Sequence, residues 1–185
     1  MGTSVDVRFD LAQIRKKLES ENAAYKLNMF SCDTVPQGVP RGVICEVTGS
    51  ARTEWILSLM KQNSNLNTFW AEESLTLLPT ALHQRGIDLS RVLMAETHEL
   101  LFPALRKALQ SKLFDCIVLP GKLHEVKILK ALQLFARESN AGVFFLSKQS
   151  QRAWAIQFQV EAEWTDPQAY AVKVLKKKLY HSSLS

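Results

Sequence analysis

The sequence lacks the features of a membrane-bound or disulfide-linked protein. No apolar run approaches the roughly 20 residues of a membrane-spanning helix. The first residues, MGTSVDVRFD, contain no basic segment followed by an apolar stretch, so we expect no signal peptide. The cysteines Cys32, Cys45 and Cys116 are odd in number, lack metal-ligand spacing, and in two cases lie inside apolar runs. We therefore expect a protein of the reducing cytoplasm.

The usual catalytic motifs are absent as well. No serine or cysteine stands in a nucleophile motif such as Gly-x-Ser-x-Gly. His124-Glu125 is not followed by the second histidine of a zinc-binding helix. The sequence predicts no metal site and no bound cofactor.

The charge is positive and unevenly distributed. The net charge of +5 and pI of 9.2 permit contact with a polyanion without requiring it. A run of charges is more often a solvated face than a binding site. The residues considered for nucleic-acid contact are Lys148, Arg152, Lys173, Lys176, Lys177 and Lys178.

Short apolar segments alternate with amphipathic helical patterns through most of the chain. The expected strands are residues 43–47, 68–71, 92–95, 116–119 and 143–146. Helical patterns fall between them, including one that contains Leu75, Leu78 and Leu82 and another over residues 98–112. Continuously apolar strands joined by helices predict an α/β fold whose mainly parallel sheet is covered on both faces.

The two ends of the chain differ from this pattern. Residues 8–20 read as a helix with Leu11, Ile14 and Leu18 on one face, and residues 21–37 read as irregular. From Trp154 to Trp164 apolar and polar residues alternate, and residues 165–167 have turn chemistry. We expect a C-terminal antiparallel hairpin with both tryptophans in the core. The predicted division is an N-terminal helix and lead-in at 1–37 and one α/β domain at 38–185.

The loop after the first strand stands where an α/β sheet often binds phosphate. A phosphate loop has the pattern G-x-x-x-x-G-K-[ST], in which backbone N–H groups surround the phosphates and the lysine and hydroxyl complete the site. Here Gly49 is present, Arg52-Thr53 replaces Lys-Thr, and Ala51 replaces the second glycine. The loop is also about three residues too short to surround a phosphate. We predict a degenerate nucleotide site.

Four segments, in order along residues 38–179, resemble motifs of one family. Gly38–Gly49 resembles G-x-P-x-G-R-[IV]-x-E-[IV]-x-G, and Phe69–Glu72 resembles a strand ending in the glutamate that activates the hydrolytic water. Leu82–Leu93 resembles A-x-x-L-G-[VI]-D-x-x-x-L-L, and Val172–Leu179 resembles V-K-V-x-K-N-K. The set is similar to the RecA recombinase family, which implies a RecA-like core with an N-terminal helix.

The departures from that family concern catalysis and DNA binding. Pro120 stands where the resemblance implies the magnesium-positioning aspartate, so Glu72 would have no metal-bound nucleotide to act on. An ordinary strand-end glutamate is the better interpretation of Glu72. The two loops that hold DNA in a recombinase would fall near residues 121–126 and 147–153, and both are short here. We expect no hydrolytic activity, although residual nucleotide binding through Gly49, Arg52 and Thr53 remains an alternative.

Two bacterial groups combine a RecA-like core with a decayed nucleotide site: the ImuA family of translesion-synthesis accessory factors, and the SulA family of division inhibitors that bind FtsZ. The segments Gly38–Gly42, Arg85–Arg91 and Val172–Lys177 resemble ImuA-like chains more closely. This implies an adaptor of the DNA-damage (SOS) response that contacts a recombinase or a polymerase-like subunit. The alternatives are SulA-like division inhibition and direct DNA binding. Leu11, Ile14 and Leu18 are candidate partner contacts, or they pack on their own domain.

Overall fold

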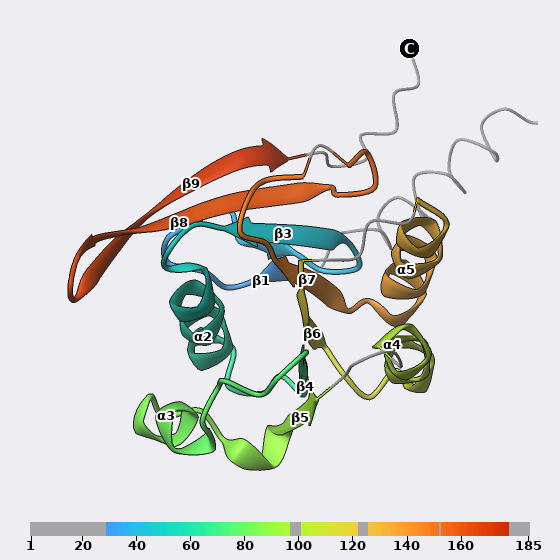
Figure 1. Cartoon of the computed structure of the whole chain (residues 1–185), viewed down its shortest axis with the longest axis horizontal. Helices are drawn as coiled ribbons and strands as arrows, with labels where there is room; N and C mark the ends of the chain where they lie inside the picture. The colour runs from blue at the N-terminus through green and yellow to red at the C-terminus, as the bar shows by residue number, and fades with distance from the viewer. Residues whose placement is uncertain (1–28, 97–100, 122–125, 152, 178–185) are drawn as a thin grey trace, which may run out of the picture.

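Seven strands form one sheet in the computed structural model, which describes residues 29–96, 101–121, 126–151 and 153–177 (Figure 1). The spatial order is β5-β4-β6-β7-β3-β8-β9, and every pairing is parallel except β8 with β9. The strands are β3 (Ile44–Thr48), β4 (Thr68–Glu72), β5 (Val92–Glu96), β6 (Cys116–Pro120), β7 (Gly142–Leu146), β8 (Phe158–Asp166) and β9 (Ala169–Lys177). The α/β class, the parallel sheet and the C-terminal hairpin predicted from the sequence are confirmed.

Helices cover both faces of this sheet (Figure 1). The helices are α2 (Arg52–Gln62), α3 (Pro79–Gln84), α4 (Leu101–Ser111) and α5 (Val126–Ser139), with a short 3-10 turn, η1 (Leu89–Arg91), before β5. The connections that run from β3 toward β5 place α2 and α3 on one face. The connections that return from β5 to β7 place α4 and α5 on the other, as right-handed crossovers require.

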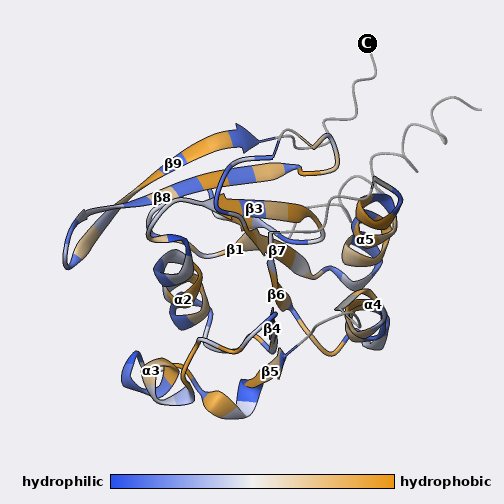
Figure 2. Ribbon diagram, viewed as in Figure 1, coloured by the Kyte–Doolittle hydropathy of each residue, from blue (hydrophilic) through white to orange (hydrophobic). Residues whose placement is uncertain are grey.

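The inner strands alternate between two cores because successive side chains of a strand point to opposite faces. In β6, Cys116 and Val118 pack with α2, whereas Ile117 and Leu119 pack with α4 and α5. All of these side chains are buried, so the strand is apolar along nearly its whole length (Figure 2). Burial raises the pKa of the Cys116 thiol to about 12, so the thiol stays protonated near neutral pH.

A small second sheet begins in the stretch 21–37 that was expected to be irregular and ends just after it. Strand β1 (Met29–Phe30) pairs antiparallel with β2 (Val39–Pro40). Phe30 is fully buried, and its ring lies 5.8 Å from that of Phe144 in β7. Such a two-residue strand has no alternating pattern to detect, so its formation depends on packing against the main sheet.

Three sequence expectations are wrong in detail. The helix expected around Leu75 and Leu78 is only α3, which begins at Pro79 and leaves those leucines 41% and 63% exposed. Trp154 is not in the hairpin, because β8 begins at Phe158, and the Trp154 side chain is 48% exposed beneath Lys130.

Trp164, also expected in the core, is 42% exposed. It lies near the turn of the hairpin, which extends past α2 (Figure 1), and packs edge-to-face against Tyr170 at 5.7 Å. The alternating pattern therefore predicted the face on which these residues lie but not how far the hairpin extends beyond the core.

Several candidate residues lie outside the described part of the chain. These are Leu11, Ile14, Leu18, Arg152 and Lys178. Within the described residues, no helix has both the length and the apolar character needed to cross a membrane.

A substitution at Phe144 tests whether the small sheet and the main core form one packed unit. Its ring contacts Phe30 of β1 and lies 6.4 Å from Trp55 of α2. Phe144→Ala should lower the free energy of unfolding by about 3–5 kcal/mol, because it leaves a cavity at this junction. Urea denaturation measures the loss, and Leu134→Ala on the exposed face of α5 is the control, with a change within about 0.5 kcal/mol. Equal effects of the two substitutions would contradict the packing described here.

Candidate nucleotide site

The degenerate loop lies at the edge of the sheet where parallel strands end. The chain leaves β3 toward β4 on one side, and β8 lies against β3 on the other side. The order in which the chain adds strands to the sheet therefore reverses beside β3. Crevices at such switch points are the usual ligand sites of α/β proteins. The loop at residues 49–51 joins β3 directly to α2.

The backbone of this loop is attached to β8. The amide of Ala51 donates a 2.9 Å hydrogen bond to the carbonyl oxygen of Ala162. Gly49 has φ +95°, and a Cβ there would collide with the same carbonyl. The glycine is therefore required by close approach to the protein's own strand.

A carboxylate of the protein occupies the hydrogen-bonding position offered by the loop. Glu163 Oε2 accepts a 3.1 Å bond from the Ser50 amide and a 2.5 Å bond from the Ser50 hydroxyl. These two bonds, and the nearby positive charge of Arg52, lower the pKa of Glu163. The group is therefore an anion near neutral pH, and it binds donors that a phosphate would otherwise need.

Arg52 and Thr53 begin α2 and are half-buried. The Arg52 guanidinium donates a 2.9 Å bond from Nη1 to the carbonyl oxygen of Gly49. The Arg52 side chain thus folds back on the loop, and this hydrogen bond stabilises the connection between β3 and α2.

Glu72 is held by its own strand and the turn that follows. Its Oε1 accepts a 2.9 Å bond from Trp70 Nε1, and its Oε2 accepts bonds from the Thr76 amide at 2.5 Å and the Thr76 hydroxyl at 2.9 Å. Partial burial raises the pKa of Glu72, but these bonds and one from the Leu77 amide outweigh it, so the pKa is lowered. The geometry favours a turn-stabilising glutamate over a catalytic base.

Pro120 ends β6 and pairs with Leu146 of β7. Strand β7 separates it from β3, and the amide of the next residue, Gly121, donates a 3.0 Å bond to the Leu146 carbonyl. The five predicted site residues thus lie at one edge of the sheet, at or after the ends of three different strands, β3, β4 and β6. The structure brings only Gly49, Arg52 and Thr53 together in one connection.

Sequence reasoning missed a buried carboxylate beside this edge. Glu46 of β3 is fully buried and accepts hydrogen bonds from the Gln151 amide at 3.0 Å and from Gln159 Nε2 at 2.7 Å. The Ser150 hydroxyl lies 3.4 Å from the same carboxylate. Glu46 therefore holds the segment after β7 against the sheet. The signal was available, because a glutamate inside an apolar strand needs hydrogen-bond partners.

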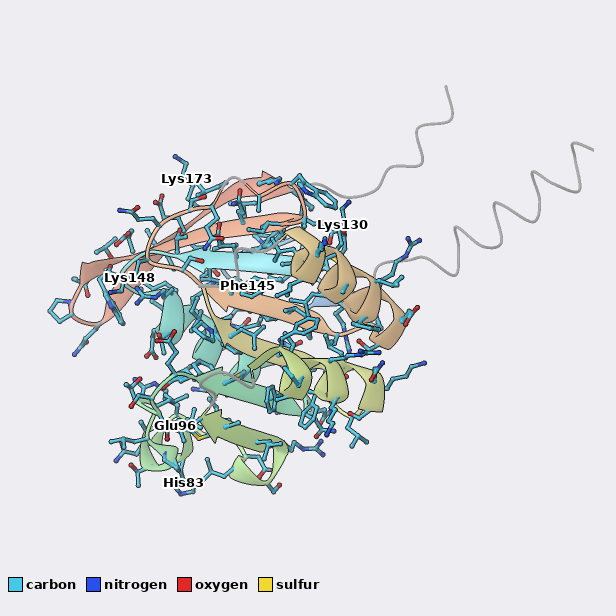
Figure 3. All side chains as sticks on the ribbon, turned by 45° about the vertical axis from the view of Figure 1, so that its right-hand side comes forward. His83, Glu96, Lys130, Phe145, Lys148 and Lys173 are labelled. Atoms are coloured by element: carbon cyan, nitrogen blue, oxygen red, sulfur yellow. The ribbon has the colours of Figure 1, made fainter. Side chains whose placement is uncertain are left out.

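The described basic candidates come from two places. Lys148 is exposed just after β7, and Lys173 is exposed in the middle of β9 (Figure 3). Lys176 Nζ donates a 3.2 Å bond to the Ala153 carbonyl, and Lys177 donates to the Gln37 side chain. Among the described residues, no group of three histidine, cysteine or acidic side chains could hold a metal ion.

The Glu163 contact predicts a defined pH dependence. Because folding lowers the Glu163 pKa, its stabilising contribution is present above the unfolded pKa of about 4.3 and is lost as the pH falls through the folded value. The NMR resonance of the Ser50 amide should report this titration, and Glu163→Gln should abolish it. Glu138→Gln, at an exposed position of α5, should preserve it. A Ser50 titration that persists in Glu163→Gln would refute the contact.

Comparison with known proteins does not assign the chain. No model of a protein family matches it, and no curated protein sequence matches it.

Proposed function

We propose that this chain is a non-hydrolysing, RecA-like accessory protein of the bacterial DNA-damage response. It acts through protein contacts that support translesion DNA synthesis. The placement of the family-like segments supports the proposal. Gly38–Gly49 leads through β3 to the degenerate loop, Phe69–Glu72 forms most of β4, and Val172–Lys177 lies within β9 at the far edge of the sheet.

The Glu163 carboxylate on Ser50 is the observation on which the proposal mainly rests. A nucleotide phosphate would have to displace an anion that the chain itself supplies. It would find neither the surrounding loop backbone of a phosphate site nor a carboxylate at Pro120 to position magnesium. Glu72, held by the following turn, supplies no base for hydrolysis.

Within this proposal, a damage-response adaptor fits better than a division inhibitor. The distinguishing segment is the basic final strand, which the ImuA-like resemblance implies and SulA-like chains usually lack. Lys173, Lys176 and Lys177 all lie on β9. Neither role requires the hydrolysis of a nucleotide.

A calorimetric titration with magnesium-ATP tests the proposal, with a purified RecA recombinase as second titrant. We expect no saturable heat from ATP and saturable binding of the recombinase. Micromolar ATP binding, equivalent to about −8 kcal/mol, would mean that the β3–α2 loop still holds phosphate and would overturn the proposal. Failure to bind the recombinase would leave a polymerase-like subunit as the remaining partner of the adaptor, to be titrated in the same way.

One observation favours direct nucleic-acid binding as a second candidate function. The Trp154 ring is 48% exposed, and Lys130 Nζ lies 5.6 Å from its centroid. Partly exposed aromatic rings together with nearby cations are what single-strand binding proteins use to stack bases and hold the backbone.

If that second function holds, Trp154→Ala should weaken binding of a single-stranded oligonucleotide by roughly tenfold or more, because stacking on an aromatic side chain contributes about 1–3 kcal/mol per base. Affinity should also fall steeply with salt, as counterion release requires. Fluorescence anisotropy at several salt concentrations measures both effects, and Trp164→Ala is the control. A flat salt response, or equal effects of the two tryptophans, would remove this candidate.

A further inference from the structure

Strand β9 forms the edge of the seven-stranded sheet. Among the described residues, its nine residues pair only with β8, so its outer edge presents backbone N–H and C=O groups (Figure 1). Such an edge is a template for a further strand. The register of β8 and β9 is regular from Val160 opposite Val174 to Trp164 opposite Tyr170. This segment offers an uninterrupted ladder.

The pairs along this ladder alternate in chemistry. Val160 faces Val174 and Ala162 faces Val172, whereas Glu161 faces Lys173. Directly opposed side chains of an antiparallel pair contact one another, and opposite charges there are favourable. The inner neighbour of β9 is therefore a strand of alternating apolar and acidic residues.

The outer side of β9 combines an apolar face with one charged residue on the other face. The apolar members Tyr170, Val172 and Val174 share one face, on which Val174 is 40% exposed and the other two are half-buried. Lys173 is exposed on the opposite face, where its neighbours are Ala171 and the partly exposed Leu175, and hydrophilic and hydrophobic segments both occur along β9 in Figure 2. A strand added outside β9 would meet apolar side chains on one face and, on the other, a lysine flanked by two apolar residues.

We propose that the outer edge of β9 binds an extended segment of a partner protein in which apolar and acidic residues alternate, by adding that segment as an eighth strand. The backbone ladder supplies affinity, and the side-chain alternation supplies specificity. Such a segment is the part of a partner protein that the proposed adaptor would bind, so this inference rests on the proposed function. An acidic residue opposite Lys173 would repeat, outside the strand, the pairing that Glu161 makes inside it.

Charge argues against a second copy of the chain as the occupant. Two β9 strands in one ladder would bring the lysines of both copies, 173, 176 and 177, onto a single pair of strands. Like charges along a strand pair are unfavourable, and lysines on an edge strand are a common means of preventing self-pairing. Nucleic acid fits less well, because it offers no backbone ladder to a strand edge and no partner for the apolar row.

A synthetic peptide with the sequence of residues 158–166 is a suitable probe, since it contains the strand that β9 already binds on its inner edge. Calorimetry with the full chain should show saturable binding. A peptide in which both glutamates between the apolar positions are lysine should bind about tenfold more weakly. Lys173→Glu should reverse this preference by a similar factor, which corresponds to about 1.4 kcal/mol. Lys107→Glu, at an exposed position of α4, is the matched control and should preserve the wild-type preference.

Hydrogen exchange locates the peptide. Binding outside β9 should add protection to β9 amides that do not bond to β8, whereas replacement of β8 would add none and would contradict the proposal. Equal affinity of the two peptides for both variants would also overturn it. The proposal would also be overturned if the chain bound no peptide but self-associated in sedimentation experiments, and a substitution in β9 abolished that self-association. An oligonucleotide that binds β9 while the acidic peptide does not would overturn it in favour of nucleic acid.

The two proposals fail separately in this experiment. Absence of peptide binding together with absence of ATP binding would remove the docking edge and leave the adaptor function in place. ATP binding would overturn the adaptor function whatever the peptide does.

Discussion

The β3–α2 loop and strand β8 hold one another in place, and the arrangement of the carboxyl edge of the sheet depends on this contact. The Ala51 amide bonds to the Ala162 carbonyl, and Ser50 binds Glu163, residues that lie more than a hundred positions further along the chain. The parallel pairing of β3 with β8 brings these groups together. The start of α2 and the middle of β8 are thus held together by the same contact.

This contact places an anion of the chain at the donors where an α/β sheet would otherwise bind an anionic ligand. The Glu163 carboxylate is tethered beside Ser50, so its effective concentration there exceeds that of a dilute nucleotide. Its lowered pKa keeps it ionised near neutral pH, and Arg52 is engaged with the Gly49 carbonyl. The loop therefore joins β3 and α2 to β8, and its close approach to the Ala162 carbonyl accounts for the glycine at position 49.

The sequence predicted the elements that have a strong local pattern. Apolar runs predicted the strands from β3 to β7, and an alternating pattern predicted the hairpin. These predictions succeed because the hydrophobic residues of each strand determine which of its faces is buried. The contacts that define the candidate site do not: Glu163 and Ser50 are joined only by tertiary structure, and Glu46 is satisfied by a distant segment. The hydrophobic pattern also predicted helix before Pro79, where the structure has none. The leucines there fit a helical period but remain exposed.

Strand β8 has a double role because its two kinds of residue point in opposite directions. Its apolar members Val160 and Ala162 enter the core beside α2, while its acidic members Glu161 and Glu163 lie on the other face. Glu163 then satisfies the degenerate loop, and Glu161 faces a lysine of β9. The same row of carboxylates thus binds the β3–α2 loop on one side of β8 and faces Lys173 of the edge strand β9 on the other. The Ser50 contact and the pairing with Lys173 are in this way two consequences of one amphipathic strand.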